Sequence, residues 1–153
     1  MRQRAVLTKS SIAAQETCPT MQRFIEWLAT KHQVDVSIAG VCLWLALPGT
    51  RERLLIAGLS GQRISITHCV ADVDGRLACD MDLVFLVDEV GWQPIELLHS
   101  EAVWAAYVQR MAATGGAQVY DEAGEIRLLS FAEDWAKQLT HQHWLKDSQS
   151  VLV

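Results

Sequence analysis

The chain has 153 residues, of which 50% are hydrophobic and 20% are charged, a composition typical of one globular domain and not of a disordered protein. Its formal net charge of −5, without any run of lysine and arginine, argues against nucleic acid as a partner, because duplex-binding domains carry a basic stripe. No apolar segment reaches the roughly 18 residues that a membrane helix requires, and no signal-peptide pattern follows the basic first residues. We therefore expect a cytoplasmic protein without membrane association.

The first helix is predicted over residues 17–32. An N-terminal arm, residues 1–16, precedes it and lacks periodicity, so we expect this arm to be extended or flexible. Pro19 suits a first helical turn, and Thr17 or Thr20 can cap the helix. Apolar residues recur at helical spacing and form one stripe that we expect to face the core: Met21, Phe24, Ile25 and Leu28.

Five β-strands are predicted next, because the apolar period changes from 3.6 to 2 after residue 34. Their expected bounds are 41–47, 53–59, 63–70, 77–87 and 92–98. The turn Asp72–Gly75 joins the third and fourth strands into a hairpin, with the loop either at 73–74 or at 74–75. Pro94 cannot donate a hydrogen bond to a ladder, which favours an edge strand or a bulge.

The C-terminal part is predicted to contain two more helices. The first covers residues 100–111 with Ser100 as its cap, and a small hairpin over 117–129 follows it. The last helix opens with a capping box, Ser130 to Glu133, and runs toward Trp144, before a flexible tail at 147–153. Residues 17–146 then form one α+β domain, in which an antiparallel meander of about five strands, with the small hairpin, packs against three helices.

The predicted hairpin contains one histidine, two cysteines and four aspartates between residues 66 and 82. Because side chains alternate along a strand, His68 should share the apolar face with Cys79 and Met81. The opposite face should then carry Thr67, Cys69, Asp80 and Asp82. This split argues against one metal or Cys–His site, and the EF-hand spacing is not met. We expect the turn aspartates to serve the turn itself.

The remaining histidines and cysteines give no stronger site. His141 and His143 would point about 200° apart on a helix, so they cannot share a metal, and His99 stands alone before a predicted helix. The four cysteines contain no C-x-x-C pair, so free and largely buried thiols are expected. We predict no cofactor, no metal and no catalytic residue.

The chain contains six tryptophans, a high number for its length. Trp104 and Trp135 lie on the core faces of their predicted helices. Trp27 is expected to be partly exposed. Core packing is the simpler interpretation for most of the six, but some lie where an exposed aromatic patch could form. The predicted interaction surface therefore consists of Trp44, Trp92, Trp144, Thr67, Asp80 and Asp82.

Four stretches, in the same order along the chain, resemble a family of small proteins that forms a domain of unknown function on bacterial plasmids, phages and integrative elements. The resemblance spans about residues 41–145 and is carried by Ile64-Ser-Ile-Thr-His-Cys, Asp74-Gly-Arg-Leu-Ala-Cys-Asp-Met-Asp-Leu-Val-Phe, Gly91-Trp-Gln-Pro-Ile-Glu-Leu and the closing segment 129–145. The chain lacks the family's usual proline near Asp80. The resemblance implies a cytoplasmic accessory protein of a bacterial mobile element and assigns no reaction.

The leading hypothesis is a non-enzymatic binding or regulatory protein that acts on another protein, and an anti-defence or immunity-like role belongs to this class. The alternative is a metal-assisted hydrolase that uses His68 or His99 with Asp80 and Asp82. A third option is a small-ligand module with a pocket lined by tryptophan. The oligomeric state stays open, with a homodimer among the choices.

Overall fold

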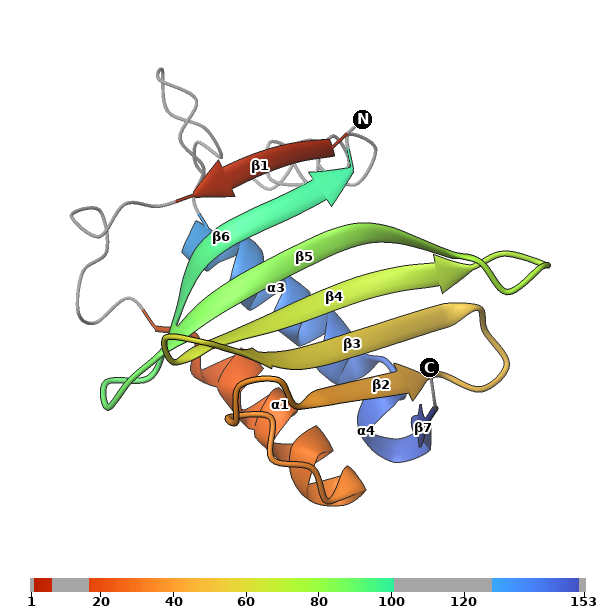
Figure 1. Cartoon of the computed structure of the whole chain (residues 1–153), viewed down its shortest axis with the longest axis horizontal. Coiled ribbons are helices and arrows are strands. Elements are labelled where there is room, and N and C mark those ends of the chain that lie inside the picture. Colours follow the sequence, from red (N-terminus) through yellow and green to blue (C-terminus); the bar gives the residue numbers. More distant parts are fainter. Residues whose placement is uncertain (1, 7–16, 101–127, 152–153) are drawn as a thin grey trace.

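The fold is an α+β domain built on one antiparallel sheet (Figure 1). The computed structural model describes residues 2–6, 17–100 and 128–151. Its strands are β1 (Arg2–Val6), β2 (Cys42–Ala46), β3 (Glu52–Leu59), β4 (Arg63–Ala71), β5 (Leu77–Val87), β6 (Trp92–Ser100) and β7 (Gln149–Ser150), and its helices are α1 (Pro19–His32), α3 (Leu128–His141) and α4 (Trp144–Asp147). The sheet order is β1-β6-β5-β4-β3-β2-β7. The predicted meander of five consecutive strands is confirmed.

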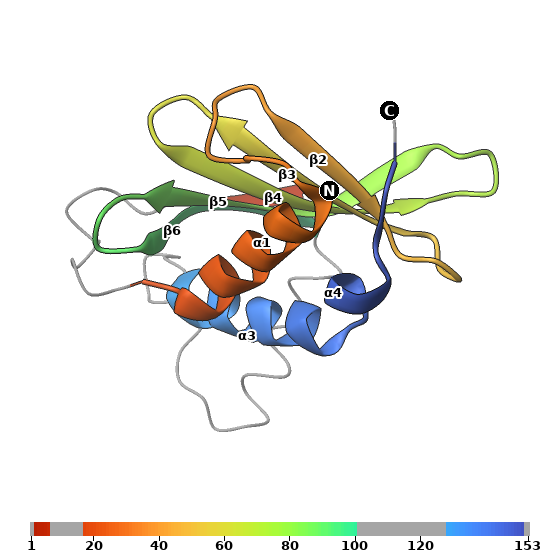
Figure 2. The ribbon, with the colours of Figure 1, turned by 90° about the horizontal axis from the view of Figure 1, so that it is seen from below.

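The three described helices lie together on one face of the sheet (Figure 2). The predicted apolar stripe of α1 is buried against that face, and α3 contributes Phe131, Trp135 and Leu139 to the same core. From the sheet, every second side chain points into this layer, among them Leu45, Leu54, Ile56, Ile66, Leu83 and Leu97. In the part of the chain that the structure describes, no helix covers the opposite face, which we call the outer face.

Both ends of the described chain belong to the sheet. Residues 2–6, predicted as part of an extended or flexible arm, form β1 and pair with β6 from Arg2–Ser100 to Val6–Glu96. In the predicted C-terminal tail, residues 149–150 form β7 beside β2, and the N–H of Val151 donates to the carbonyl of Trp44 at 3.0 Å. Unpaired strand edges offer a row of backbone donors and acceptors, which these terminal segments satisfy.

Two predicted helix caps are wrong, and a contact between helices uses two of the side chains concerned. The N-cap of α1 is Cys18, without a side-chain cap, and its N–H donates to the carbonyl of Trp92 at 2.7 Å. The helix α3 begins at Leu128, before the predicted capping box. The carboxylate of Glu133 instead accepts a 3.2 Å hydrogen bond from the hydroxyl of Thr20, which joins α3 to α1.

A bulge accommodates Pro94 in β6, which has a strand on each side. The register shifts so that Phe85 lies opposite Pro94 while Val84 lies opposite Glu96. The extra residue on β6 is Ile95. Of the two interpretations of Pro94, the bulge is therefore confirmed, as expected for a residue without an N–H.

Part of the predicted C-terminal region lies outside the described residues. Ser100, predicted to cap a helix, is the last residue of β6, and Leu128 and Leu129, predicted in a small hairpin, belong to α3. The rest of that helix, with Trp104, and the rest of that hairpin fall on residues 101–127. Among the helices that the structure describes, none combines the length and the apolar character needed to cross a membrane.

Candidate functional site

The β4–β5 hairpin turns through residues 72–76. The N–H of Asp72 donates to the carbonyl of Arg76 at 2.8 Å, and one carboxylate oxygen of Asp72 accepts from the N–H groups of Asp74 and Arg76, both at 2.8 Å. Gly75 has a φ of 82°, which glycine adopts without steric cost. The expectation that Asp72 serves the turn is confirmed, although the loop is longer than either predicted register.

A second β-bulge lies within this hairpin and changes which side chains meet. Thr67 pairs with Asp82 and His68 with Met81, but Cys69 then pairs with Cys79, so that Asp80 is an extra residue on β5. Two residues of the bulged strand oppose one residue of its partner, which locally breaks the alternation of faces. The predicted separation of His68 from Asp80 is therefore wrong.

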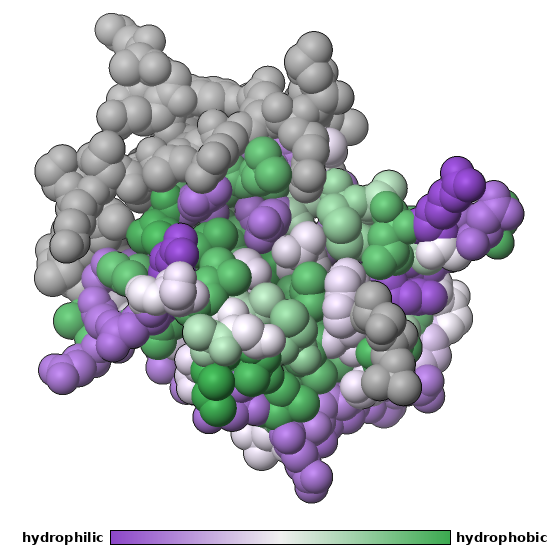
Figure 3. All heavy atoms as spheres, in the orientation of Figure 1, coloured by the Kyte–Doolittle hydropathy of each residue, from purple (hydrophilic) through white to green (hydrophobic). Residues whose placement is uncertain are grey.

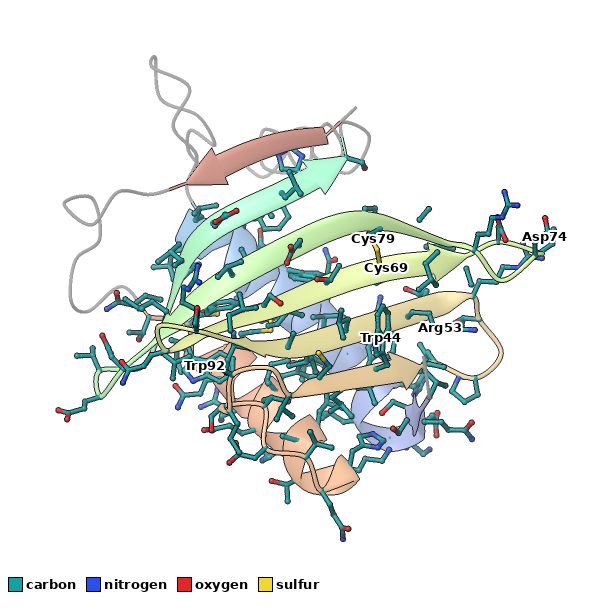
Figure 4. All side chains as sticks on the ribbon, viewed as in Figure 1. Trp44, Arg53, Cys69, Asp74, Cys79 and Trp92 are labelled. Atoms are coloured by element: carbon teal, nitrogen blue, oxygen red, sulfur yellow. A yellow bond between two sulfur atoms is a disulfide. The ribbon has the colours of Figure 1, made fainter. Side chains whose placement is uncertain are left out.

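The bulge also places Cys69 and Cys79 on the same side of the ladder, where they form a disulfide (Figure 4). The prediction of four free thiols, which was based on the absence of a C-x-x-C pair, is wrong for this pair, because the bulge brings together two cysteines that regular alternation would place on opposite faces. Cys18 and Cys42 are free, the first buried and the second exposed. Burial raises the pKa of the Cys18 thiol to about 12, so this group is protonated and unreactive at neutral pH.

His68 lies between two carboxylates on the helix-covered side of the sheet. Its Nδ1 is 2.7 Å from an oxygen of Asp80 on β5, and its Nε2 is 3.1 Å from an oxygen of Glu52 on β3. A neutral imidazole has one N–H and can donate to only one carboxylate, whereas an imidazolium donates to both. The geometry therefore favours the charged ring.

The pKa of His68 is the balance of opposing effects. Burial of the ring, whose side chain is 15% exposed, lowers the pKa, while the hydrogen bonds and negative charges of Asp80 and Glu52 raise it. The sum is a pKa above the ordinary value of 6.5. The three side chains thus form a charged cluster whose net charge is −1 when His68 is protonated.

A small cavity adjoins this cluster beneath the C-terminal half of α3. Its volume is about 170 Å³, and its other lining residues are Met81, Trp135, Gln138, Leu139 and Gln142. Ligand pockets for drug-sized molecules are typically larger than about 300 Å³. Among the described residues, no serine, threonine or cysteine lines this cavity.

Of the four side chains of the alternative hydrolase site, the structure brings together His68 and Asp80, whereas His99 and Asp82 lie elsewhere. His99 on β6 is buried and lies opposite Met81, which separates it from His68 by two strand spacings, about 10 Å. Its Nδ1–H donates to the carbonyl of Ser100, and burial outweighs this bond in lowering the pKa of His99. Asp82 lies on the outer face, where it accepts a 3.2 Å hydrogen bond from Thr67.

The geometry also gives no shared set of metal ligands. Both ring nitrogens of His68 already engage a carboxylate, so these three side chains do not converge on one point. His143 lies 3.8 Å from Asp147 at an exposed position and does not meet His141 at a common site. Within residues 17–100 and 128–151, no group of three or more histidine, cysteine, aspartate and glutamate side chains could hold a metal ion.

The six residues of the predicted interaction surface lie in three separate parts of the structure. Trp92 and Trp144 are core residues, 4% and 0% exposed, so the interpretation that they join an exposed patch is wrong. Trp92 faces the helix layer and packs on Phe85, with 5.8 Å between ring centroids. Trp144 opens α4 beneath the sheet, and its ring N–H donates to the side chain of Gln142.

The other predicted surface residues include a row on the outer face. Trp44 pairs with Leu55, Leu55 with Thr67, and Thr67 with Asp82, so these side chains cross four neighbouring strands. Asp80 does not belong to this row, because the bulge turns it toward His68. Trp27 is 61% exposed on α1, which confirms that part of the prediction.

The tip of the β4–β5 hairpin carries exposed apolar residues that sequence reasoning missed. Val70, Val73 and Leu77 are 38%, 78% and 42% exposed. The hairpin projects beyond the helices and neighbouring strands, with Asp74 at its end (Figures 1 and 4). Val73, an apolar residue between two turn aspartates, was the signal that could have indicated this surface. We call residues 70–78, closed at their base by the Cys69–Cys79 disulfide, the clamped hairpin.

Comparison of the chain with protein-family models, with curated proteins and with solved structures gave no match. The resemblance to the mobile-element family therefore stays a prediction.

Proposed function

We propose that this chain is a non-enzymatic binding protein that recognises another protein through the clamped hairpin. The observation that carries the proposal is the gathering of exposed apolar side chains on this projecting segment. Three of the six large hydrophobic residues that are exposed among the described residues lie within residues 70–78. The space-filling view shows the hairpin standing clear of the body, with hydrophobic and hydrophilic residues side by side (Figure 3).

The chemistry of the hairpin suits a protein partner. Apolar side chains at the tip lose contact with water when they enter a pocket, which is the usual source of binding energy at an interface. Arg76, Asp72 and Asp74 surround them and are exposed, as in the polar rim of such an interface. A nucleic acid or an anionic membrane would be repelled by the overall charge of −5.

The disulfide favours this role because it fixes the shape of the hairpin before binding. Ordering a flexible loop at an interface costs conformational entropy, and a covalent link across the base removes part of that cost. The turn is further held by the two hydrogen bonds that Asp72 accepts. Val73 and Leu77 are therefore presented on a preorganised backbone.

The same proposal includes a biological role for the chain. An accessory role in a bacterial mobile element, of the anti-defence or immunity-like kind, agrees with the resemblance of residues 41–145 and with a binding surface that lacks a reaction centre. The hydrolase alternative gains no support, because His68 meets Asp80 while His99 and Asp82 lie elsewhere.

A cytoplasmic location is part of the proposal and has a consequence for the disulfide. Disulfides persist in oxidising compartments, and in the cytoplasm they are mostly transient or redox-sensing. A cytoplasmic protein would therefore hold Cys69 and Cys79 as thiols for part of the time. Acid quenching of cells, followed by alkylation and mass spectrometry, measures that fraction directly.

Site-specific photo-crosslinking tests the binding role. A benzophenone amino acid at Val73 should capture one protein from a lysate of the host bacterium, and Leu77→Ser in the same chain should abolish the product. The matched control is Trp27→Ser, which changes a hydrophobic residue on α1 that is more exposed than Leu77, 61% against 42%, and should leave the product intact. If Leu77→Ser leaves the product unchanged, or if both substitutions remove it alike, the hairpin is not the binding element.

A further inference from the structure

A large hollow lies at the opposite end of the sheet from the clamped hairpin. Two adjoining cavities, of about 750 and 700 Å³, share Ser37, Ile64 and Val87 in their walls. Together they form one groove between α1 with its following loop on one side and the β3–β4 and β5–β6 turns on the other. Each volume falls within the range of about 300–1,000 Å³ that is typical of ligand pockets.

The floor of this groove is apolar. Ile64 and Val87 come from β4 and β5, Trp92 from the start of β6, and Ile25 and Val36 from α1 and the loop after it. At one end Val90, 56% exposed on the β5–β6 turn, extends this apolar lining to the rim. An apolar side chain placed here would lose water on several sides at once.

The rim of the groove is acidic. Four carboxylates and one guanidinium line it, which gives a formal charge of −3 where the whole chain carries −5. These residues are Glu26, Asp35, Asp88, Glu89 and Arg63. We call the whole feature the acidic groove.

None of the four carboxylates is neutralised by a cation in the part of the chain that the structure describes. Asp35 accepts hydrogen bonds from Ser37, Asp88 from the N–H groups of Val90 and Gly91, and Glu26 from Gln22. These partners are all uncharged. The negative potential of the rim is therefore available to a ligand, and a groove with low-dielectric walls concentrates such a potential.

We infer that the acidic groove binds a peptide segment of a partner protein in which an apolar side chain is flanked by lysine or arginine. The apolar side chain would occupy the floor formed by Ile64, Val87 and Trp92. The flanking cations would lie beside Glu26 on α1 and Glu89 on the β5–β6 turn. This inference is independent of the clamped hairpin, which lies at the other end of the sheet (Figure 1).

The charge pattern decides between this occupant and others. An acidic peptide or a nucleic acid would meet four carboxylates and one arginine, which is unfavourable. A purely apolar segment would leave the rim charges without partners of opposite sign. A cationic segment without an apolar side chain would gain only the screened attraction of exposed charges, which falls off at physiological ionic strength.

Titration with synthetic peptides tests the inference. The probe is a fluorescein-labelled peptide of alternating lysine and leucine, seven residues long, with one peptide in which serine replaces leucine and one in which glutamate replaces lysine. Fluorescence anisotropy should show binding of the lysine–leucine peptide at least tenfold tighter than of the other two. In ¹⁵N spectra the bound peptide should shift the amides of Ile64, Val87 and Glu89 and leave that of Asp74 in place.

Charge reversal supplies the matched control. Glu26→Lys/Glu89→Lys should weaken binding at least tenfold, whereas Asp74→Lys/Asp134→Lys, with the same change of net charge away from the groove, should change it less than twofold. Circular dichroism verifies that both variants fold. The inference is overturned if both double variants weaken binding equally, if the lysine–serine peptide or spermidine binds as tightly as the lysine–leucine peptide, or if the peptide does not bind at millimolar concentration.

Discussion

Removal of the Cys69–Cys79 disulfide should destabilise the protein by an amount that follows from the loop it closes. The two cysteines are separated by 10 residues along the chain. The loop-closure entropy that such a crosslink removes from the unfolded state corresponds to about 3 kcal/mol at 25 °C. For a chain of this length, that loss lowers the melting temperature by roughly 6–12 °C. We therefore expect Cys69→Ala/Cys79→Ala to fold with a melting temperature lower by that amount.

Differential scanning calorimetry of wild type and double variant, with and without a phosphine reductant, measures the effect. The reductant should lower the melting temperature of wild type to that of the variant and leave the variant unchanged. Thiol titration in denaturant identifies the bond, because unreduced wild type should show the two free thiols of Cys18 and Cys42 and the reduced chain all four. A shift below about 2 °C in reduced wild type would refute the loop-entropy argument.

Three further outcomes are expected. Trp144→Ala should lower the free energy of urea unfolding by about 3–5 kcal/mol because the ring is fully buried, whereas Trp27→Ala should change it by less than about 0.5 kcal/mol. Equal effects of the two substitutions would contradict the assignment of Trp144 to the core. Because the folded-state pKa of His68 is raised, the stabilisation that its charge provides is fully present below pH 6.5 and is lost as the pH rises through the raised value. The difference in unfolding free energy between wild type and His68→Gln should therefore shrink from about pH 5 to about pH 9. Parallel stability curves for the two proteins would argue against a charged His68. Gly58→Ala should lower the free energy of urea unfolding by about 1–3 kcal/mol, because a Cβ at this position would clash with the carbonyl oxygen of Ile38. A loss below about 0.5 kcal/mol would show that the loop after α1 can move to make room for the methyl group.

The spacing of apolar residues predicted most of the fold, because that spacing is regular in α1 and along most of the strands. The stripe Met21 to Leu28 identified the buried face of α1, and the change of period after residue 34 identified five strands within one or two residues of their observed ends. Pro94 indicated a bulge through a purely local property, its missing N–H. The pairing of residues 2–6 with β6 had no comparable local signal, because it depends on which strand edge the folded sheet leaves open.

Helix caps and the exposure of tryptophan were decided by tertiary contacts. The sequence from Ser130 to Glu133 satisfies a capping pattern, yet Glu133 accepts from Thr20 of another helix. Trp92 and Trp144 lie near the ends of their elements, a position that suggests exposure, but both rings are buried in the core between the sheet and the helices. Local pattern describes the neighbours in sequence, and burial depends on the neighbours in space.

The candidate site depends on a single inserted residue. The sequence by itself determined that residues 66–82 form a hairpin, that its turn is built on Asp72 and Gly75, and that His68 lies on the helix-covered side. Only the tertiary structure decided that Asp80 is the extra residue of a bulge, which brings its carboxylate to His68 and joins Cys69 to Cys79. The physical reason is that alternation along the sequence assigns each side chain to a face of the sheet only while the hydrogen-bonded ladder is regular. A one-residue shift of register moves every following side chain to the other face.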